Sequence, residues 1–352
     1  MWEVWLTLCE DSEFPGPMAR PLGSFNGKSD YHYQCVRCNV DLLKVIQLGI
    51  TLFNADGESP PASLLGEMDM NGRRNGARSL DQLPYTWQFN FKFSLDDDMY
   101  SETVIEVLKH AGTNFALQER DGIDPFEFGA LLISSGLVCD EDVKWIGFGS
   151  AYDFAYITKL LRRLPLPDDE AEFYQDMRKF FPTVYDVKYL VKYVLKEQSL
   201  ANHPPYDPST NEILQKFAEK TSLDGLAESL KLKRQGPPSA PGPESILIGK
   251  VFFRIRDAMY NGEIEEMHNG QVWGFTIPEN SIFNTPSGFQ LVEAGQNTPL
   301  PNGYTNGAPS TPNTGNARLV HTPSNNSGPR GIQPMTPGGG GGVFGAFDLS
   351  RQ

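Results

Sequence analysis

Short apolar runs of the kind that form β-strands alternate with helical patterns along the chain as far as about residue 275. The runs 45–53 and 86–93 predict strands, the second because four aromatic residues alternate there with polar ones. A third strand is predicted over 143–149. Strands that come first and are then mixed with helices indicate an α/β or α+β domain built on a mixed sheet.

Helical patterns occupy the segments between and after these strands. Acids in the first turn favour a helix within 96–112, and the segment after residue 149 continues directly as a helix. The remaining predicted helices are 124–136, 168–181, 223–232 and 245–262.

We therefore expect one domain over residues 1–275. A polar insert at 56–84 interrupts it and has the Gly, Pro and Asn content of a long loop. Residues 276–352 are dominated by Gly, Pro, Asn, Ser and Thr. Because such a segment cannot bury enough apolar area to offset its ordering entropy, it is predicted to be a disordered C-terminal tail.

Composition restricts the function further. The 352 residues carry a formal net charge of −14, which disfavours broad electrostatic attraction to nucleic acid or to an anionic membrane. A nucleic-acid enzyme of this charge would need metal ions or a local basic surface. The four cysteines do not complete a zinc site, and no apolar run approaches membrane-spanning length. We expect a soluble intracellular protein with free thiols.

The stretch "EDSEFPG" places Asp11 and Glu13 two residues apart at the end of an apolar run. In a strand these two carboxylates share one face, and two adjacent carboxylates resist ionisation unless a cation neutralises them. Such a pair suits a divalent metal. The alternative is a solvated strand end that begins a turn at Pro15-Gly16.

Several segments together give this motif a context. "EFPGPMARPLGSF", "YQCVRCNVDLLKVIQLGITLF", "WQFNFKFSLDDDMYSETVIEVLKHAG", "GIDPFEFGALLISSGLV", "VKWIGFGSAYDFAYITKLL", "FFPTVYDVKYL" and "ILIGKVFFRIRDAMYNGEIEE" closely resemble the Caf/Pop family of poly(A)-specific ribonucleases, the deadenylase subunit of the Ccr-Not complex. The resemblance covers most of residues 11–275 and excludes the insert and the tail.

The resemblance implies an α/β protein with the RNase H-like fold of DEDD exonucleases, a mixed central sheet flanked by helices. It implies 3′-to-5′ removal of adenylates from mRNA with two ions, Mg²⁺ or Mn²⁺, that activate water and stabilise the leaving oxygen. The implied partners are the 3′ ends of poly(A) RNA, the MIF4G region of the Not scaffold and the second deadenylase of the complex, without a membrane. The implied location is cytoplasmic and nuclear.

Carried over residue by residue, four acids become the predicted catalytic and metal-binding residues: Asp11, Glu13, Asp153 and Glu244. Asp11 and Glu13 match the first D-[ST]-E pair of the family, and Asp153 in "SAYDFAY" matches its third acid. The alternative for Asp153 is a helix capping box with Ser150. Asp186 in "TVYDVKYL" also matches the family pattern, and a structural role and a site role both remain open for it.

The sequence departs from the family pattern around the fourth acid. Where members carry a stretch resembling G-P-Q-H-Q-A-G-S-D-S, this chain has "GPPSAPGPES", so Ser239 replaces the His and Glu244 the Asp. Gly149 replaces a second His. Four prolines suggest a different backbone path for this loop. Loss of a general base typically costs about 10²- to 10⁴-fold in rate.

The beginning of the chain also departs from the family. Members have a helix before the D-[ST]-E strand, and this sequence lacks a counterpart. Glu10 is expected to point to the opposite face from Asp11 in a strand buried on both sides, where an unpaired charge is costly. The first strand is therefore expected to be imperfect and the chain less stable than its relatives.

Two functions from different classes remain open. The first is a metal-dependent poly(A) 3′-to-5′ exoribonuclease, favoured by the matching acids. The second is a catalytically weakened or inactive scaffold or regulatory subunit of the same complex, favoured by the replacements at Ser239, Glu244 and Gly149. Nucleotide-binding enzymes are disfavoured because no G-x-G-x-x-G follows a strand, and RRM-type and KH-type RNA binding because no basic aromatic signature is present.

Overall fold

The computed structural model describes residues 7–59, 85–199 and 206–275. The tail 276–352, most of the polar insert and the first six residues lie outside this description. Within the described ranges the chain forms one mixed sheet of five strands: β1 (Thr7–Glu13), β2 (Gln47–Phe53), β3 (Thr86–Asn90), β4 (Lys144–Gly147) and β5 (Thr183–Asp186).

The strand order in this sheet is β3-β2-β1-β4-β5. β2 pairs with both β1 and β3 in antiparallel, whereas β1 pairs with β4, and β4 with β5, in parallel. The predicted mixed sheet is thus confirmed. β1 pairs with β2 along its whole length, from Thr7 opposite Phe53 to Glu13 opposite Gln47, so the strand expected to be imperfect is completely paired over its described residues.

The described helices cover both faces of the sheet. In chain order they are α1 (Lys28–Leu42), α3 (Glu102–His110), α4 (Phe115–Asp121), α5 (Pro125–Ser134), α6 (Ala151–Arg162), α7 (Glu170–Phe180), α8 (Val187–Ser199), α9 (Pro208–Glu219), α10 (Leu223–Ser229) and α11 (Pro241–Met259). A short 3₁₀ helix spans Glu266–His268. None of the helices in the described part of the chain is long and apolar enough to cross a membrane.

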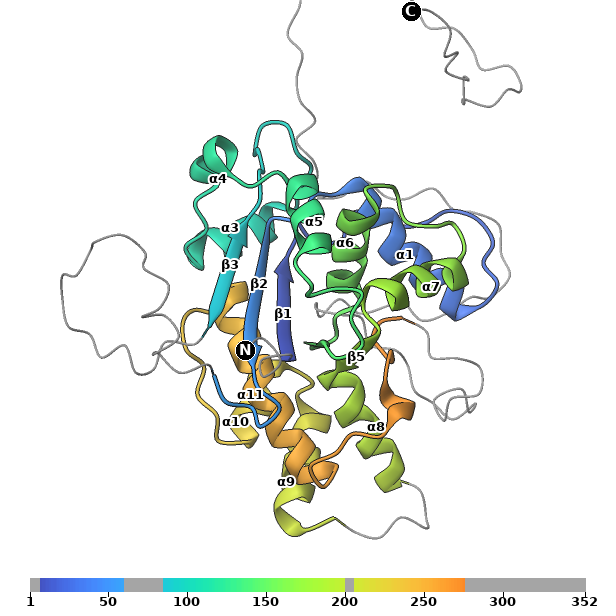
Figure 1. Cartoon of the computed structure of the whole chain (residues 1–352), viewed down its shortest axis with the longest axis vertical. Helices are drawn as coiled ribbons and strands as arrows, with labels where there is room; N and C mark the ends of the chain where they lie inside the picture. Colours follow the sequence, from blue (N-terminus) through green and yellow to red (C-terminus); the bar gives the residue numbers. More distant parts are fainter. Residues whose placement is uncertain (1–6, 60–84, 200–205, 276–352) are drawn as a thin grey trace, which may run out of the picture. The chain divides into compact units, whose positions relative to one another are not determined.

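The alternation of side chains along β1 separates two cores. Leu8 belongs to the cluster formed with α1, α5, α6 and α7, whereas Cys9 belongs to the cluster formed with α8, α9, α10 and α11. Figure 1 shows these two groups of helices around the sheet. A smaller cluster joins Ile46 and Phe93 to α3 and α4 at the β3 side. β1 is therefore the central element of the domain.

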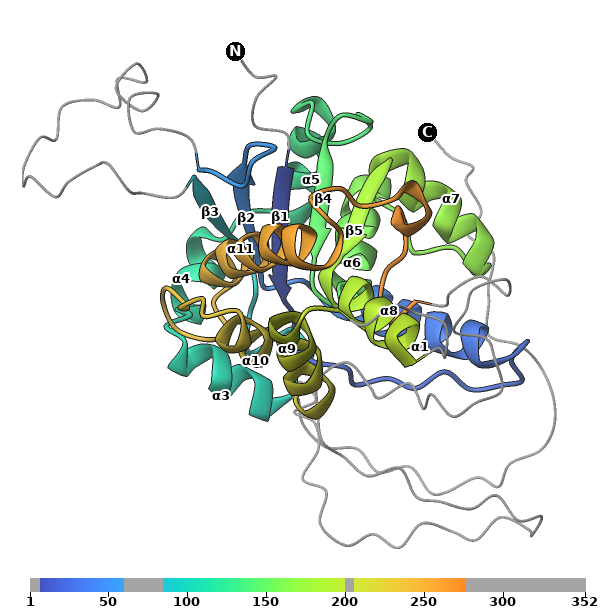
Figure 2. The ribbon, with the colours of Figure 1, turned by 90° about the horizontal axis from the view of Figure 1, so that it is seen from below.

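Helix α11 approaches the sheet unusually closely. A Cβ atom built on Gly49 of β2 would lie 2.1 Å from the carbonyl oxygen of Pro241, and one on Gly249 would lie 2.2 Å from the ring of Phe53. Only glycine fits at these two contacts. In Figure 2 the helix crosses in front of β1 and β2. This packing places the first turn of α11, with Glu244, beside the acid-bearing strand.

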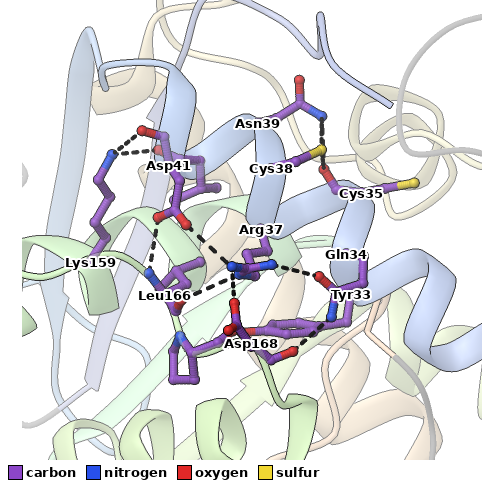
Figure 3. Close-up of polar contacts among 12 residues, drawn as sticks. Tyr33, Gln34, Cys35, Arg37, Cys38, Asn39, Asp41, Lys159, Leu166 and Asp168 are labelled. Carbon is purple, nitrogen blue, oxygen red and sulfur yellow. Dashed lines mark hydrogen bonds and ion pairs between the residues drawn. The ribbon is translucent and has the colours of Figure 1, made fainter. Parts of the chain in front are cut away.

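Helix α1 is held against α6 and the segment that follows it, in the same layer, by polar contacts (Figure 3). Lys159 of α6 donates to the carbonyl oxygens of Val40 and Asp41 at 2.6 and 3.1 Å, and Arg37 forms an ion pair with Asp168. Asn39 accepts hydrogen bonds from the backbone N–H groups of Met18 and Ala19, at 2.6 and 2.7 Å. These contacts fix the chain that follows β1.

The predicted elements differ from the observed ones in their bounds, and three of these differences have a physical reason. The strand predicted over 86–93 ends at Asn90, and Trp87 is 44% exposed because β3 is the edge strand of the sheet. The helix predicted within 96–112 begins at Glu102, after a turn in which Asp98 accepts from the Ser94 N–H. The last helix begins four residues earlier than predicted, because Pro241 and Pro243 fit its first turn, where proline loses no helical hydrogen bond.

Candidate active site

Asp11 and Glu13 lie side by side at the C-terminal end of β1. They share the face of Cys9, toward α11, as their spacing predicts. Burial, and then the negative charges of Glu244 and Asp153, raise the pKa of Glu13 to about 8. The pKa of Asp11 is raised well above its ordinary value by burial first, then by Glu244, Glu13 and Asp153. The two carboxylates thus face an excess of negative charge.

Asp153 lies in the first turn of α6 on the other face of β1. Its carboxylate accepts hydrogen bonds from the backbone N–H of Ser12, at 3.0 Å, and from the Ser12 hydroxyl. Burial raises the pKa of Asp153 to about 6, although these bonds from Ser12 oppose the shift. The capping-box alternative is wrong, because the Ser150 side chain makes no cap hydrogen bond and instead donates to Asp186. Ser12, between the two motif acids, links Asp153 to them.

Glu244 occupies the first turn of α11. Its carboxylate accepts from Nη1 of Arg234 at 2.8 Å and from the backbone N–H of Ser239 at 3.0 Å. Arg234 also pairs with Asp224 at 2.6 Å. The Glu244 charge contributes to the raised pKa values of both Asp11 and Glu13, so it is close to both. The structure therefore brings the four predicted site residues, Asp11, Glu13, Asp153 and Glu244, into one acid cluster.

Asp186 has a different environment from these acids. It is fully buried, and its two carboxylate oxygens accept from the backbone N–H groups of Gly149, Ser150, Tyr189 and Trp273 at 3.0 to 3.1 Å. The Ser150 hydroxyl donates as well, at 3.2 Å. Burial raises its pKa, and the four backbone bonds oppose the shift. Asp186 thus ties the ends of β4 and β5 to the segment after α11, which is a structural role.

The donor set of the acid cluster suits a hard divalent cation. Carboxylates are the ligands that Mg²⁺ and Mn²⁺ prefer, and a cation would relieve the repulsion that raises the pKa values of Asp11 and Glu13. Within the three described ranges, no group of three His, Cys, Asp or Glu side chains is arranged to hold one ion. Asp153 is bonded to Ser12 and Glu244 to Arg234, so two of the four acids have other partners.

Glu10 is a fifth acid close to this cluster. It points to the opposite face from Asp11, as expected, and a Cβ on Gly147 would lie 2.4 Å from its Oε1. The side chain is 1% exposed, and neither carboxylate oxygen has a hydrogen-bond partner. Burial, and then the charges of Asp153 and Asp186, raise its pKa well above the ordinary value. The buried, unpaired carboxyl of Glu10 therefore destabilises the folded state.

Comparison with known proteins identifies the family. The model of the CAF1 family ribonucleases matches residues 131–254. The Poly(A) ribonuclease pop2 of Schizosaccharomyces pombe is 35% identical over 317 residues, which cover 90% of this chain and 79% of that protein. This chain belongs to the CAF1 ribonuclease family. CCR4-NOT transcription complex subunit 7 of Caenorhabditis elegans is also 35% identical, over 250 residues that cover 71% of this chain and 68% of that protein.

Solved structures of CAF1-family relatives share the fold. The S. pombe Pop2p structure in its Mg²⁺ and Mn²⁺ bound form superimposes with a TM-score of 0.62 and 37% identity, covering 77% of this chain and 90% of that one. A chain in the structure of the yeast NOT1 MIF4G domain co-crystallized with CAF1 matches with a TM-score of 0.54 and 28% identity. The match covers 77% of this chain and 88% of that one. The expected fold, a mixed central sheet flanked by helices, is confirmed and is shared with these relatives.

Two residues that depart from the CAF1-family pattern, Gly149 and Ser239, have a left-handed backbone conformation. Gly149 has φ of 66°, and Ser239 has φ of 55°, both in the left-handed region. A Cβ on Gly149 would lie 3.1 Å from Cδ of Lys188, so the lysine side chain fills the space beside this glycine. No sequence motif indicates that Lys188 or Arg234 lies beside the site. Their proximity depends on packing between segments that no motif connects.

Proposed function

We propose that this protein is a poly(A)-specific 3′-to-5′ exoribonuclease. The observation that carries the proposal is the acid cluster at the end of the central strand, in a chain that is 35% identical to a poly(A) ribonuclease over 90% of its length. Three of the four acids come from β1 and α6, which the fold fixes relative to each other through the Ser12–Asp153 hydrogen bonds.

We propose that Asp11, Glu13 and Asp153 hold the catalytic divalent cations, two in number, with Glu244 as the fourth ligand. Bound cations would supply an activated water and neutralise the negative charge that develops on phosphate oxygens. Because their pKa values are raised, Asp11 and Glu13 retain protons that a binding cation would displace. Ser12 orients Asp153, and Arg234 orients Glu244.

The test is a time course with the purified chain, a 5′-labelled oligoadenylate RNA and Mg²⁺ or Mn²⁺. We expect a ladder that shortens from the 3′ end and disappears in Asp11→Ala. Glu219→Ala is the matched control, because Glu219 is an exposed acid at the end of α9 and should leave the ladder unchanged. Absence of shortening by the folded wild-type chain, with both metals, would refute the proposal.

One observation favours the second function, a weakened or inactive scaffold subunit. Glu244 is engaged by Arg234 and by the Ser239 N–H, and the chain has no histidine between residues 204 and 267 to act near the reacting water. If this function holds, Ser239→His combined with Glu244→Asp should gain deadenylation that the wild-type chain lacks. If the exoribonuclease proposal holds, the wild-type chain shortens RNA before any such replacement.

We propose further that the protein binds the MIF4G region of a Not scaffold through an apolar surface on α5. Phe126 and Ile133 lie seven residues apart on one side of this helix and are 41% and 47% exposed, and neighbouring exposed apolar side chains mark interaction sites. Arg163, after α6, lies over the Phe126 ring at 5.7 Å, and its neighbour Leu164 is 60% exposed. The occupant is suggested by the relative that was co-crystallized with a MIF4G domain.

The docking proposal is tested by pull-down with a purified MIF4G domain. Ile133→Arg should abolish capture while leaving the thermal transition and the shortening of naked RNA unchanged. Val107→Arg on α3, 48% exposed, is the matched control for an added charge at an exposed apolar site. Equal capture of both variants would contradict the placement. Association with the second deadenylase and a cytoplasmic and nuclear location are proposed from family resemblance, and co-purification and imaging of the tagged protein test them.

A further inference from the structure

Two lysines on α8 form no ion pair with an acid in the described part of the chain. Lys188 and Lys192 lie four residues apart, on one side of the helix, and neither takes part in any ion pair formed by the described residues. The chain carries 44 acidic residues against 30 lysines and arginines, so carboxylates are plentiful as partners. Two neighbouring ammonium groups without one are therefore unexpected.

Both lysines are also partly removed from water. Nζ of Lys188 lies 5.7 Å from the ring centroid of Phe148, and Nζ of Lys192 lies 5.5 Å from that of Phe217. Lys192 donates to the hydroxyl of Thr221 at 3.2 Å, which does not neutralise its charge. Burial lowers the pKa of both lysines; the charge of Asp186 partly opposes this for Lys188, and the charge of Lys188 lowers the pKa of Lys192 further. The pair is held together at an electrostatic cost.

The position of the pair relates it to the acid cluster. β1, β4 and β5 run parallel, so their C-terminal ends meet at one edge of the sheet. Asp11 and Glu13 lie at the end of β1, Phe148 directly follows β4, and Lys188 follows β5 by two residues. Lys192 lies one helical turn, about 5.4 Å, farther along α8. The two cations thus extend from the edge that carries the acids.

We propose that Lys188 and Lys192 bind the phosphodiester backbone of the RNA strand on the 5′ side of the cleaved bond. The inference rests on the proposed ribonuclease function and assigns it a substrate-binding surface. Partly desolvated ammonium groups attract phosphate more strongly than fully hydrated ones, and a chain with a net charge of −14 needs local cations to hold a polyanion. The charge of Asp186 acts on Lys188, but the Asp186 oxygens accept from four backbone N–H groups and Ser150 and form no ion pair with this lysine.

The third lysine of α8, Lys196, is not part of the proposed RNA-binding surface. Lys196 is 7% exposed, and the charge of Glu197 acts on it. The surface consists of Lys188 and Lys192 with the rings of Phe148 and Phe217 beneath them. A backbone contact predicts affinity that depends on salt and is independent of base identity.

The test measures binding of fluorescein-labelled oligoadenylate and oligouridylate RNA across a range of salt concentrations. All proteins carry Asp11→Ala, so that no strand is shortened during the titration and binding is measurable whether or not the wild-type chain is an enzyme. For Lys188→Gln with Lys192→Gln we expect about tenfold weaker binding of both RNAs. We also expect the slope of log affinity against log salt to fall by about 1.4, which is about 0.7 for each lost phosphate contact.

The matched control is Lys216→Gln with Lys220→Gln, which removes two lysines four residues apart at the neighbouring α9. It should leave affinity and slope unchanged. Lys188→Arg with Lys192→Arg keeps both charges and should retain the wild-type slope, and a thermal transition of the Gln pair like that of the wild type shows that the Gln pair is folded. The proposal is overturned if the Gln pair binds RNA like the control pair, or if it loses affinity with an unchanged salt slope. Loss of MIF4G binding with unchanged RNA affinity would equally overturn it.

Discussion

Replacing Glu10 by methionine should stabilise the protein. Glu10 lies within the central strand, is 1% exposed, and has no hydrogen-bond partner for either carboxylate oxygen. Leaving such a polar group buried and unpaired costs about 2 kcal/mol or more, and methionine has a similar length and an apolar side chain. We therefore expect Glu10→Met to raise the free energy of unfolding at pH 7 by about 2 to 4 kcal/mol, or the melting temperature by roughly 4 to 15 °C.

The pH dependence provides the sharper part of this prediction. The folded-state pKa of Glu10 is raised well above its ordinary value of 4.5 by burial first, then by Asp153 and Asp186. The unfolded chain therefore releases this proton at a lower pH than the folded chain. Above pH 4.5 the wild type should lose about 1.4 kcal/mol of stability for each pH unit until the folded-state pKa is reached, relative to Glu10→Met. Below pH 4.5 the difference between the two proteins should be constant.

Urea unfolding followed by circular dichroism at several pH values measures this difference. Glu10→Gln is the control, because it removes the titration but keeps an unpaired polar group in the same place. It should show a pH-independent difference from Glu10→Met. If Glu10→Met is no more stable than wild type at pH 7, or if the difference does not grow with pH above 4.5, then Glu10 is not buried and unpaired as described.

Two further predictions follow from the other acids. Binding of Mn²⁺ at pH 7 should release protons, because the pKa of Glu13 is about 8 and a cation displaces its proton; calorimetry in two buffers of different ionisation enthalpy would contradict this if it found equal heats. Asp186→Asn should lower the free energy of unfolding by about 3 kcal/mol, because the amide NH₂ would face backbone N–H donors that now point at a carboxylate, and an unchanged urea midpoint would argue against a structural role.

The sequence predicts the sheet better than it predicts the helices. Strands 45–53 and 143–149 are close to β2 and β4, because β-rich apolar runs between turn residues are a strong local signal. Four helices, α1, α4, α8 and α9, and the short strand β5 are not predicted from the sequence. Among them α4 and α9 are capped by Asn114 and Asp207, and Pro208 stands at the first position of α9. These two helices carry capping signals that a closer reading of the sequence could have used.

Part of the site is predictable from local sequence, and part depends on how distant segments pack. The spacing of Asp11 and Glu13 predicts that they share a face, and resemblance adds Asp153 and Glu244. The contacts that set their behaviour cross the fold: Ser12 bonds to a residue 141 positions away, and Gly49 admits the backbone of Pro241. Neither contact has a sequence signal, because each depends on which elements pack together.

Charge connects the acid cluster to the lysine pair. The net charge of −14 predicts that RNA binding requires metal ions or a local basic surface, and the structure contains the means for both. Burial first, and then mutual repulsion, raise the pKa values of Asp11 and Glu13, so without a cation these carboxyls retain protons and any that ionise repel phosphate. Cations at Asp11 and Glu13 would remove that repulsion at the same edge where Lys188 and Lys192 attract the backbone. We therefore expect RNA affinity to rise when divalent metal is added, and to rise by the same factor in Lys188→Gln with Lys192→Gln if the two contributions are independent.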